Sequence, residues 1–122
     1  MKESDSIRME LQLDASDNDS RISNYFRKIA RAERHELFLD ELWPKLIDNF
    51  RVGMRQNDEY VIYNGRKTFS IFPRANSIRW HASNKWGLGY GLNYVRKLIK
   101  EKENCLQNNI SQLNSNQNGN TR

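Results

Sequence analysis

The dipeptide Asn64-Gly65 limits the fold of this chain more than any other feature, because it lies between two segments rich in β-branched and aromatic residues. Both central residues of a type I′ turn adopt positive φ, and Asn followed by Gly is a favoured pair at such turns. The flanking segments are therefore expected to pair as an antiparallel hairpin. A second turn near Asn76 adds one more strand. The sequence thus predicts a three-stranded antiparallel meander over about residues 59–81.

The register of this meander follows from the lengths of its two turns. A two-residue first turn sets Tyr60 opposite Phe69, and a four-residue second turn sets Phe72 opposite Ser77. Successive side chains then alternate between two faces of different chemistry. The face expected to pack against helices holds Tyr60, Ile62, Phe69, Ile71, Ile78 and Trp80. The face expected to stay open holds Val61, Tyr63, Arg66, Thr68, Ser70, Phe72, Ser77, Arg79 and His81.

Three amphipathic helices are expected around the meander. Apolar residues at helical spacing predict one helix near 20–34 and a second near 40–54, with Asp40 as the N-cap of the second. Pro44 fits only the first turn of that helix, because further along it would remove a hydrogen bond and clash with the preceding turn. A C-terminal helix follows the meander, and its apolar stripe is Leu88, Leu92, Val95 and Ile99.

The two ends of the chain are expected to be disordered. Residues 1–18 are rich in Asp, Ser and Asn and predict an acidic flexible arm, although alternating apolar residues over 7–13 leave a short strand as an alternative. Residues 107–122 are rich in Asn, Gln and Ser and predict a disordered tail. Residues 19–106 are expected to fold as a single α+β domain, with two N-terminal helices, the meander and the C-terminal helix.

Positive charge is concentrated in one part of the chain. Among residues 60–100, 8 are Lys or Arg and none is Asp or Glu, whereas residues 1–20 carry 2 basic and 6 acidic side chains. A basic stretch with interleaved aromatic residues suits contact with phosphates and stacking on bases. A related hypothesis is that the acidic arm folds back over this basic stretch and competes with a ligand.

The leading hypothesis is a small, non-catalytic nucleic-acid-binding protein. Its hairpin and C-terminal helix would contact DNA or RNA with little dependence on sequence, because the charge of the backbone does not depend on the bases. Binding should then weaken steeply as the salt concentration rises. The residues predicted to contact nucleic acid are Arg66, Lys67, Arg74, Arg79, His81, Lys85, Arg96, Lys97, Lys100 and Tyr63.

The alternative hypothesis is a protein-interaction or inhibitor module that recognises an acidic protein partner through the hairpin or its edge. The same positive surface serves both hypotheses. Gly87, Gly89 and Gly91 precede the C-terminal helix and add a weak anion-binding signal, since backbone N–H groups at a helix start attract anions. Their spacing matches neither the P-loop nor the dinucleotide fingerprint. We expect Trp80 and Trp86 to lie in the core.

The sequence favours a binding protein over an enzyme. Cys105 is the only cysteine, and His35 and His81 are the only histidines, so a metal site would lack ligands. A nuclease centre needs converging carboxylates, and only Asp58 and Glu59 stand near the first strand. A catalytic role for His81 or for this acidic pair stays open. We expect no cofactor and no bound metal.

The chain is expected to reside in the cytoplasm, without contact with a membrane. No apolar segment approaches the roughly 20 residues that span a bilayer. The polar, acidic N-terminus also lacks the charged and then apolar layout of a secretory signal.

Overall fold

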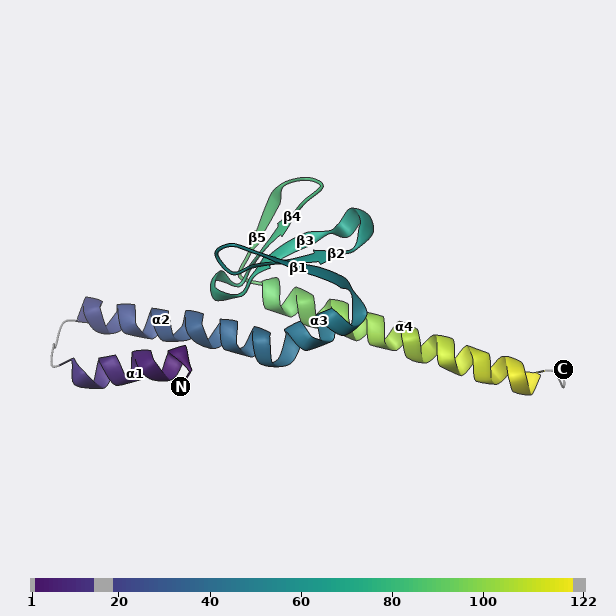
Figure 1. Ribbon diagram of the computed structural model, residues 1–122, viewed down its shortest axis with the longest axis horizontal. Helices are drawn as coiled ribbons and strands as arrows, with labels where there is room; N and C mark the ends of the chain where they lie inside the picture. Colours follow the sequence, from purple (N-terminus) through teal and green to yellow (C-terminus); the bar gives the residue numbers. More distant parts are fainter. Residues whose placement is uncertain (1, 15–18, 120–122) are drawn as a thin grey trace.

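A five-stranded antiparallel sheet lies on one side of a group of helices (Figure 1). The computed structural model describes residues 2–14 and 19–119, with side chains up to residue 106. The predicted α+β class is confirmed, whereas the number of strands and the N-terminal helices differ from the prediction. The elements are α1 (Glu3–Leu13), α2 (Asp19–Leu37), the π-helical turn η1 (Phe38–Leu42), α3 (Trp43–Asn49), β1 (Arg51–Arg55), β2 (Glu59–Tyr63), the 3₁₀ turn η2 (Gly65–Lys67), β3 (Phe69–Phe72), the 3₁₀ turn η3 (Pro73–Ala75), β4 (Ser77–Trp80), β5 (Lys85–Leu88) and α4 (Gly91–Gly119).

The core lies between the helices and one face of the sheet. Figure 1 shows the described helices gathered on that side, so the opposite face of the sheet, here called the open face, is not covered by them. The prediction that this whole face stays open is wrong for Val61, Ser70 and Ser77, which are buried. The predicted core face is confirmed, and each fully buried large apolar side chain contributes about 1.5–3 kcal/mol. The sheet supplies Tyr60, Ile62, Phe69, Ile71 and Ile78, with Trp80 partly buried beside them. The helices supply Phe38, Leu42, Leu46, Leu92, Val95 and Ile99.

Two groups of aromatic rings fix the helices on the sheet. The centroid of the Tyr60 ring on β2 lies 4.8 Å from that of Phe38 and 4.9 Å from that of Trp43. Tyr94 of α4 meets Phe69 of β3 edge-on, with centroids 5.2 Å apart. Tilted and edge-to-face pairs of this kind are more favourable than burial alone. The first group therefore holds η1 and α3 on the sheet, and the second holds α4.

The first hairpin has a longer turn than predicted. Tyr60 pairs with Ile71 rather than with Phe69, because the 3₁₀ turn η2 lengthens the connection. Gly65 has φ +57°, but Asn64 has φ −139° and therefore does not form the predicted type I′ turn. The register shifts by two residues, which leaves every strand side chain on its predicted face. The predicted register of the second hairpin is confirmed.

The predicted helix near 40–54 is wrong over its C-terminal part, which forms strand β1 at the edge of the sheet. β1 pairs along its whole length with β2. Asn57 and Asp58 in the connecting turn have φ +62° and +56°, a conformation that Asn and Asp tolerate better than most residues. Val52 and Met54 alternate as in a strand, while Met54 also continues the helical stripe, so the apolar pattern fits both structures.

The N-terminal part of the same predicted helix joins the helix before it. α2 passes through the π-helical turn η1 into α3. The wide turn ends at Leu42, two residues before Pro44, whose backbone lacks an N–H donor. Pro44 lies in the first turn of α3, as predicted. Asp40 is not an N-cap; its carboxylate instead accepts a hydrogen bond from Nζ of Lys2 at 3.0 Å.

The segment predicted to lead directly into the C-terminal helix forms strand β5 instead. Asn76, with φ +52°, connects β5 to α4. Its carbonyl oxygen accepts hydrogen bonds from the N–H groups of Gly89 and Gly91, at 3.0 and 3.1 Å, and its Oδ1 accepts one from the N–H of Leu92 at 2.8 Å. Asn76 therefore engages these N–H groups at the start of α4, which the sequence offered as an anion site.

α4 covers the core face with three residues of its predicted stripe, whereas Leu88 belongs to β5 and is exposed. The sequence predicted a disordered tail over 107–122, but the backbone of α4 continues as a helix to Gly119 and extends beyond the sheet (Figure 1). Outside the described residues lie Met1 and 15–18 of the predicted arm and 120–122 of the predicted tail.

Residues 3–13 of the predicted flexible arm form helix α1, which packs along α2. Ser4 is buried, and both its backbone N–H and its hydroxyl donate to the carboxylate of Glu36. Arg8 forms an ion pair with Glu33. The prediction failed because the segment is held by polar partners on α2 in addition to the partial burial of Ile7 and Leu11. Neither a mobile arm nor the alternative strand is present there.

Gly91→Ala is expected to destabilise the fold, although alanine is favoured over glycine within helices. A Cβ at this position would lie 2.5 Å from Cδ1 of Ile71 and 2.9 Å from the carbonyl oxygen of Ser77. Overpacking of this kind costs about 1–3 kcal/mol, which urea unfolding would detect as a lower midpoint. Gly53→Ala is the matched control, since its Cβ would meet the Tyr63 ring at an ordinary 3.5 Å. Equal midpoints for the two variants would contradict this account.

Candidate functional site

A hydrogen-bonded network lies at the centre of the open face. The carboxylate of Glu59 accepts a hydrogen bond from the hydroxyl of Ser70 at 2.5 Å and another from Nη2 of Arg79 at 3.0 Å. Nε2 of His81 lies 2.7 Å from Oγ of Ser70, and Nη1 of Arg55 reaches the carboxylate at 3.4 Å. The sequence placed Arg79 and His81 on this face but predicted it to be free of carboxylates. The sequence analysis missed Glu59 because this residue is the first of its strand and directly precedes the stretch 60–100, which has no acidic side chain.

The network keeps Glu59 ionised and His81 neutral near pH 7. Burial raises the pKa of Glu59, but hydrogen bonds from Ser70 and Arg79, with the charges of Arg79 and Arg55, lower it below its usual value. Burial lowers the pKa of His81, and the charges of the same two arginines lower it further. An ionised carboxylate can only accept, so the Ser70 hydroxyl donates to Glu59, and the neutral imidazole donates its Nε2–H to Ser70.

This combination of serine, histidine and glutamate is not arranged as a hydrolytic centre. A nucleophilic serine gives its proton to the base, whereas Ser70 donates to Glu59 and accepts from His81. Ser70 is also fully buried, so a substrate has no access to its hydroxyl. The network instead ties β2, β3 and β4 together beneath the surface of the open face.

Exposed aromatic side chains lie on either side of this network. Tyr63 is 41% exposed and Trp86 is 55% exposed. The Trp86 ring lies beside Phe72, with centroids 5.2 Å apart and ring planes inclined by 32°. The guanidinium of Arg51 lies 5.4 Å from the centroid of the Tyr63 ring. The expectation that Trp86 lies in the core is wrong, because β5 places it opposite Arg79 on the open face.

The structure separates the residues predicted to contact nucleic acid into several places. On the open face or in the adjoining turn η2 are Tyr63, Arg66, Lys67, Arg79 and His81. On α4, which covers the opposite face, are Arg96, Lys97 and Lys100. Lys85 is exposed at the start of edge strand β5. The predicted cations therefore do not form one continuous surface.

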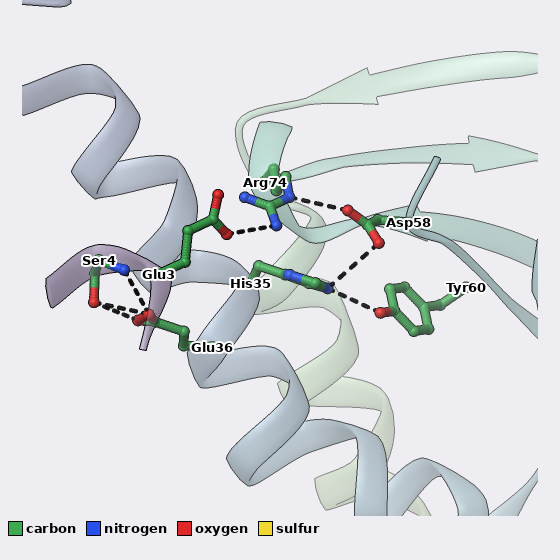
Figure 2. Close-up of polar contacts among 7 residues, drawn as sticks. All are labelled: Glu3, Ser4, His35, Glu36, Asp58, Tyr60 and Arg74. Carbon is green, nitrogen blue, oxygen red and sulfur yellow. Dashed lines mark hydrogen bonds and ion pairs between the residues drawn. The ribbon is translucent and has the colours of Figure 1, made fainter. Parts of the chain in front are cut away.

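Arg74, the remaining predicted contact, belongs to a second polar network that joins the sheet to α1 and α2 (Figure 2). Its Nε donates to Asp58 at 3.0 Å and its Nη2 donates to Glu3 of α1 at 2.7 Å. Nε2 of His35 lies 2.8 Å from the hydroxyl of Tyr60. Burial lowers the pKa of His35, and the charge of Arg74 adds to this, although Asp58 and Glu3 oppose it. The acidic segment thus engages one predicted cation, through Glu3, and otherwise packs along α2.

Within residues 2–14 and 19–119, no group of three or more His, Cys, Asp or Glu side chains is arranged to hold a metal ion. In the same part of the chain, no helix combines the length and the apolar character needed to cross a membrane. Comparisons of the chain with models of known protein families, with curated proteins and with solved structures found no match. Its chemistry is therefore inferred from its own residues.

Glu59→Gln is expected to flatten the acid dependence of stability. The pKa of Glu59 is lower in the folded chain than its ordinary value of 4.5, so the ionised carboxylate stabilises the fold above that pH. This contribution is lost as the pH falls through the lowered value. The free energy of unfolding in urea, measured from about pH 7 down to about pH 3, should therefore decline less steeply in the variant.

The matched control for this measurement is Glu41→Gln, because Glu41 is exposed and has no hydrogen bond or ion pair with the described residues. The control should decline with pH as the unmodified protein does. A Glu59→Gln variant that declines just as steeply would show that the network does not depend on the charge of Glu59.

Proposed function

We propose that this protein binds single-stranded nucleic acid on the open face of its sheet. The observation that supports this most directly is the exposure of two aromatic rings, Tyr63 and Trp86, on a sheet face that the described helices leave uncovered. Exposed apolar groups rimmed by polar ones commonly mark a binding surface. Aromatic rings beside cations on one sheet suit a nucleic acid strand, because bases stack on the rings while phosphates pair with the cations.

The exposed rings favour a single strand over a duplex. In a duplex the bases stack on one another and present only their edges in the grooves. In a single strand the faces of the bases are free to stack on Tyr63 and on the Phe72–Trp86 pair. DNA and RNA share these base faces, so the proposal covers both.

Unpaired positive charge lies beside Tyr63. Arg51 stands over the ring, and the neighbouring turn η2 carries Arg66 and Lys67. Arg66 and Lys67 are exposed, and neither makes an ion pair with another described residue. These side chains are available for phosphates at no cost in broken ion pairs.

Glu59 reduces the positive charge of the open face without cancelling it. Its single carboxylate interacts with both Arg55 and Arg79, so the three groups together remain positive. The carboxylate also fixes the guanidinium of Arg79 in position before a ligand arrives. A side chain that is already ordered loses less conformational entropy on binding.

Tyr63→Ala is expected to weaken the binding of a fluorescent single-stranded oligonucleotide by roughly tenfold, because one stacked base contributes about 1–3 kcal/mol. Fluorescence anisotropy at low salt gives the Kd. Tyr63→Phe keeps the ring and should bind nearly as tightly as the unmodified protein. Unchanged affinity in Tyr63→Ala would remove this ring from the binding surface.

The double variant Arg66→Gln/Lys67→Gln is expected to reduce the salt dependence of the same binding. For a single strand, the slope of log K against log salt changes by roughly 0.7 for each phosphate contact, so two lost contacts should lower it by about 1.4. Lys97→Gln/Lys100→Gln removes the same charge from α4 and should leave the slope nearly unchanged. Equal changes in the two double variants would mean that only the net charge matters.

The same titration distinguishes the nucleic-acid proposal from the competing hypothesis of an acidic protein partner. The cations suit either ligand, but the exposed ring faces favour bases. If no single- or double-stranded oligonucleotide binds at low salt, while an acidic polypeptide such as polyglutamate does, the nucleic-acid proposal is wrong.

A further inference from the structure

A hollow of about 260 Å³ lies at the rim of the open face, between α2, η3 and β5. Phe72 and Trp86, the paired rings of the open face, belong to its lining, so the hollow adjoins the proposed binding surface. Pockets for drug-sized ligands usually measure about 300–1,000 Å³. The hollow is smaller than this range, so it can enclose only part of one nucleotide, such as its base, with the rest of the nucleotide outside it.

Two arginines line this hollow, one without an ion pair and one with its guanidinium paired to carboxylates. Arg31 of α2 is exposed and makes no hydrogen bond or ion pair with the described residues. Arg74 of η3 has its Nε on Asp58 and its Nη2 on Glu3. The guanidinium of Arg31 is thus free, and its planar set of N–H donors matches a phosphate group.

Asp58 provides an acceptor in the same hollow. Its Oδ2 accepts from Arg74, while its Oδ1 lies 3.9 Å from Nε2 of His35, which is too far for a hydrogen bond (Figure 2). A carboxylate offers about four lone-pair sites, so Asp58 retains the capacity to accept further hydrogen bonds. A ligand group beside it should carry N–H donors, because a carbonyl oxygen would be repelled.

We propose that the hollow binds one nucleotide of the bound strand and prefers guanine there. The base stacks on Trp86, the phosphate pairs with Arg31, and the Watson–Crick edge donates its adjacent N1–H and N2–H groups to Asp58. Uracil offers a single N–H between two carbonyl oxygens on that edge, which matches a carboxylate poorly. This inference rests on the proposed function and adds one position of base preference to contacts that are otherwise sequence-tolerant.

Guanosine 5′-monophosphate and uridine 5′-monophosphate are the probes for this site, because they share a phosphate and differ at the base edge. Binding is followed by the indole N–H signal of Trp86 in ¹⁵N NMR spectra, assigned with Trp86→Phe. The guanine nucleotide should bind at least about fivefold more tightly than the uracil nucleotide, the lower range of discrimination by a two-bond base contact. Guanosine without its phosphate should bind more weakly than its monophosphate.

Two variants separate the two contacts. Asp58→Asn should abolish the preference for guanine, and Arg31→Gln should make the monophosphate bind as weakly as guanosine. Lys97→Gln, which removes the same charge from α4, should change neither. Because Asp58 also holds Arg74, the urea midpoint of its variant is compared with that of the unmodified protein. Arg31 has no such contact, so its variant gives a test even if Asp58→Asn unfolds.

The outcomes distinguish this inference from the proposed function. Equal binding of the two nucleotides, unaffected by Arg31→Gln, overturns the guanine site, while oligonucleotide binding that depends on Tyr63 still supports the open face. Nucleotide binding that depends on Arg31 and Asp58, without any oligonucleotide binding, supports the hollow and contradicts the open-face proposal. If neither probe binds, both are wrong.

Discussion

The alternation of side chains along antiparallel strands is the constraint on which the rest of this structure depends. It directs Tyr60 and Ile62 of β2 into the core and turns Glu59, Val61 and Tyr63 of the same strand to the opposite face. The described helices cover one face of the sheet, so Tyr63 and Trp86 on the other face stay exposed. The core and the proposed binding surface are thus two consequences of one backbone geometry.

The same alternation explains which parts of the fold the sequence predicts. The predicted register of the hairpin at Asn64 was wrong by two residues, but an even shift keeps each side chain on its predicted face of the sheet. The edge strands were missed because short apolar patterns fit both a strand and a helix, as at Met54. Asn57 and Asp58 were the available signal for the β1–β2 hairpin, since both residue types favour turns with positive φ. α1 was missed because its polar partners, Glu33 and Glu36, are distant from it in the sequence.

The candidate site was harder to predict, since its contacts join residues far apart in the sequence. The cations of residues 60–100 do not gather on one surface. Three of them lie on α4, on the far side of the sheet, and Arg74 is paired with carboxylates. Glu59 precedes that stretch by one residue and yet lies at the centre of the open face. Arg31 lies outside the basic stretch of residues 60–100, and only the tertiary fold brings it to the same hollow as Trp86.

The hydrogen bonds of Asn76 determine which elements unfold locally together. Through its main chain and side chain it holds the end of β5 and the first turn of α4 together. The strand that carries Trp86 and the helix that carries Val95 should therefore fluctuate as a single cooperative unit. A molecule bound to the indole of Trp86 should therefore slow the exchange of amide protons with solvent at the start of α4, on the far side of the sheet.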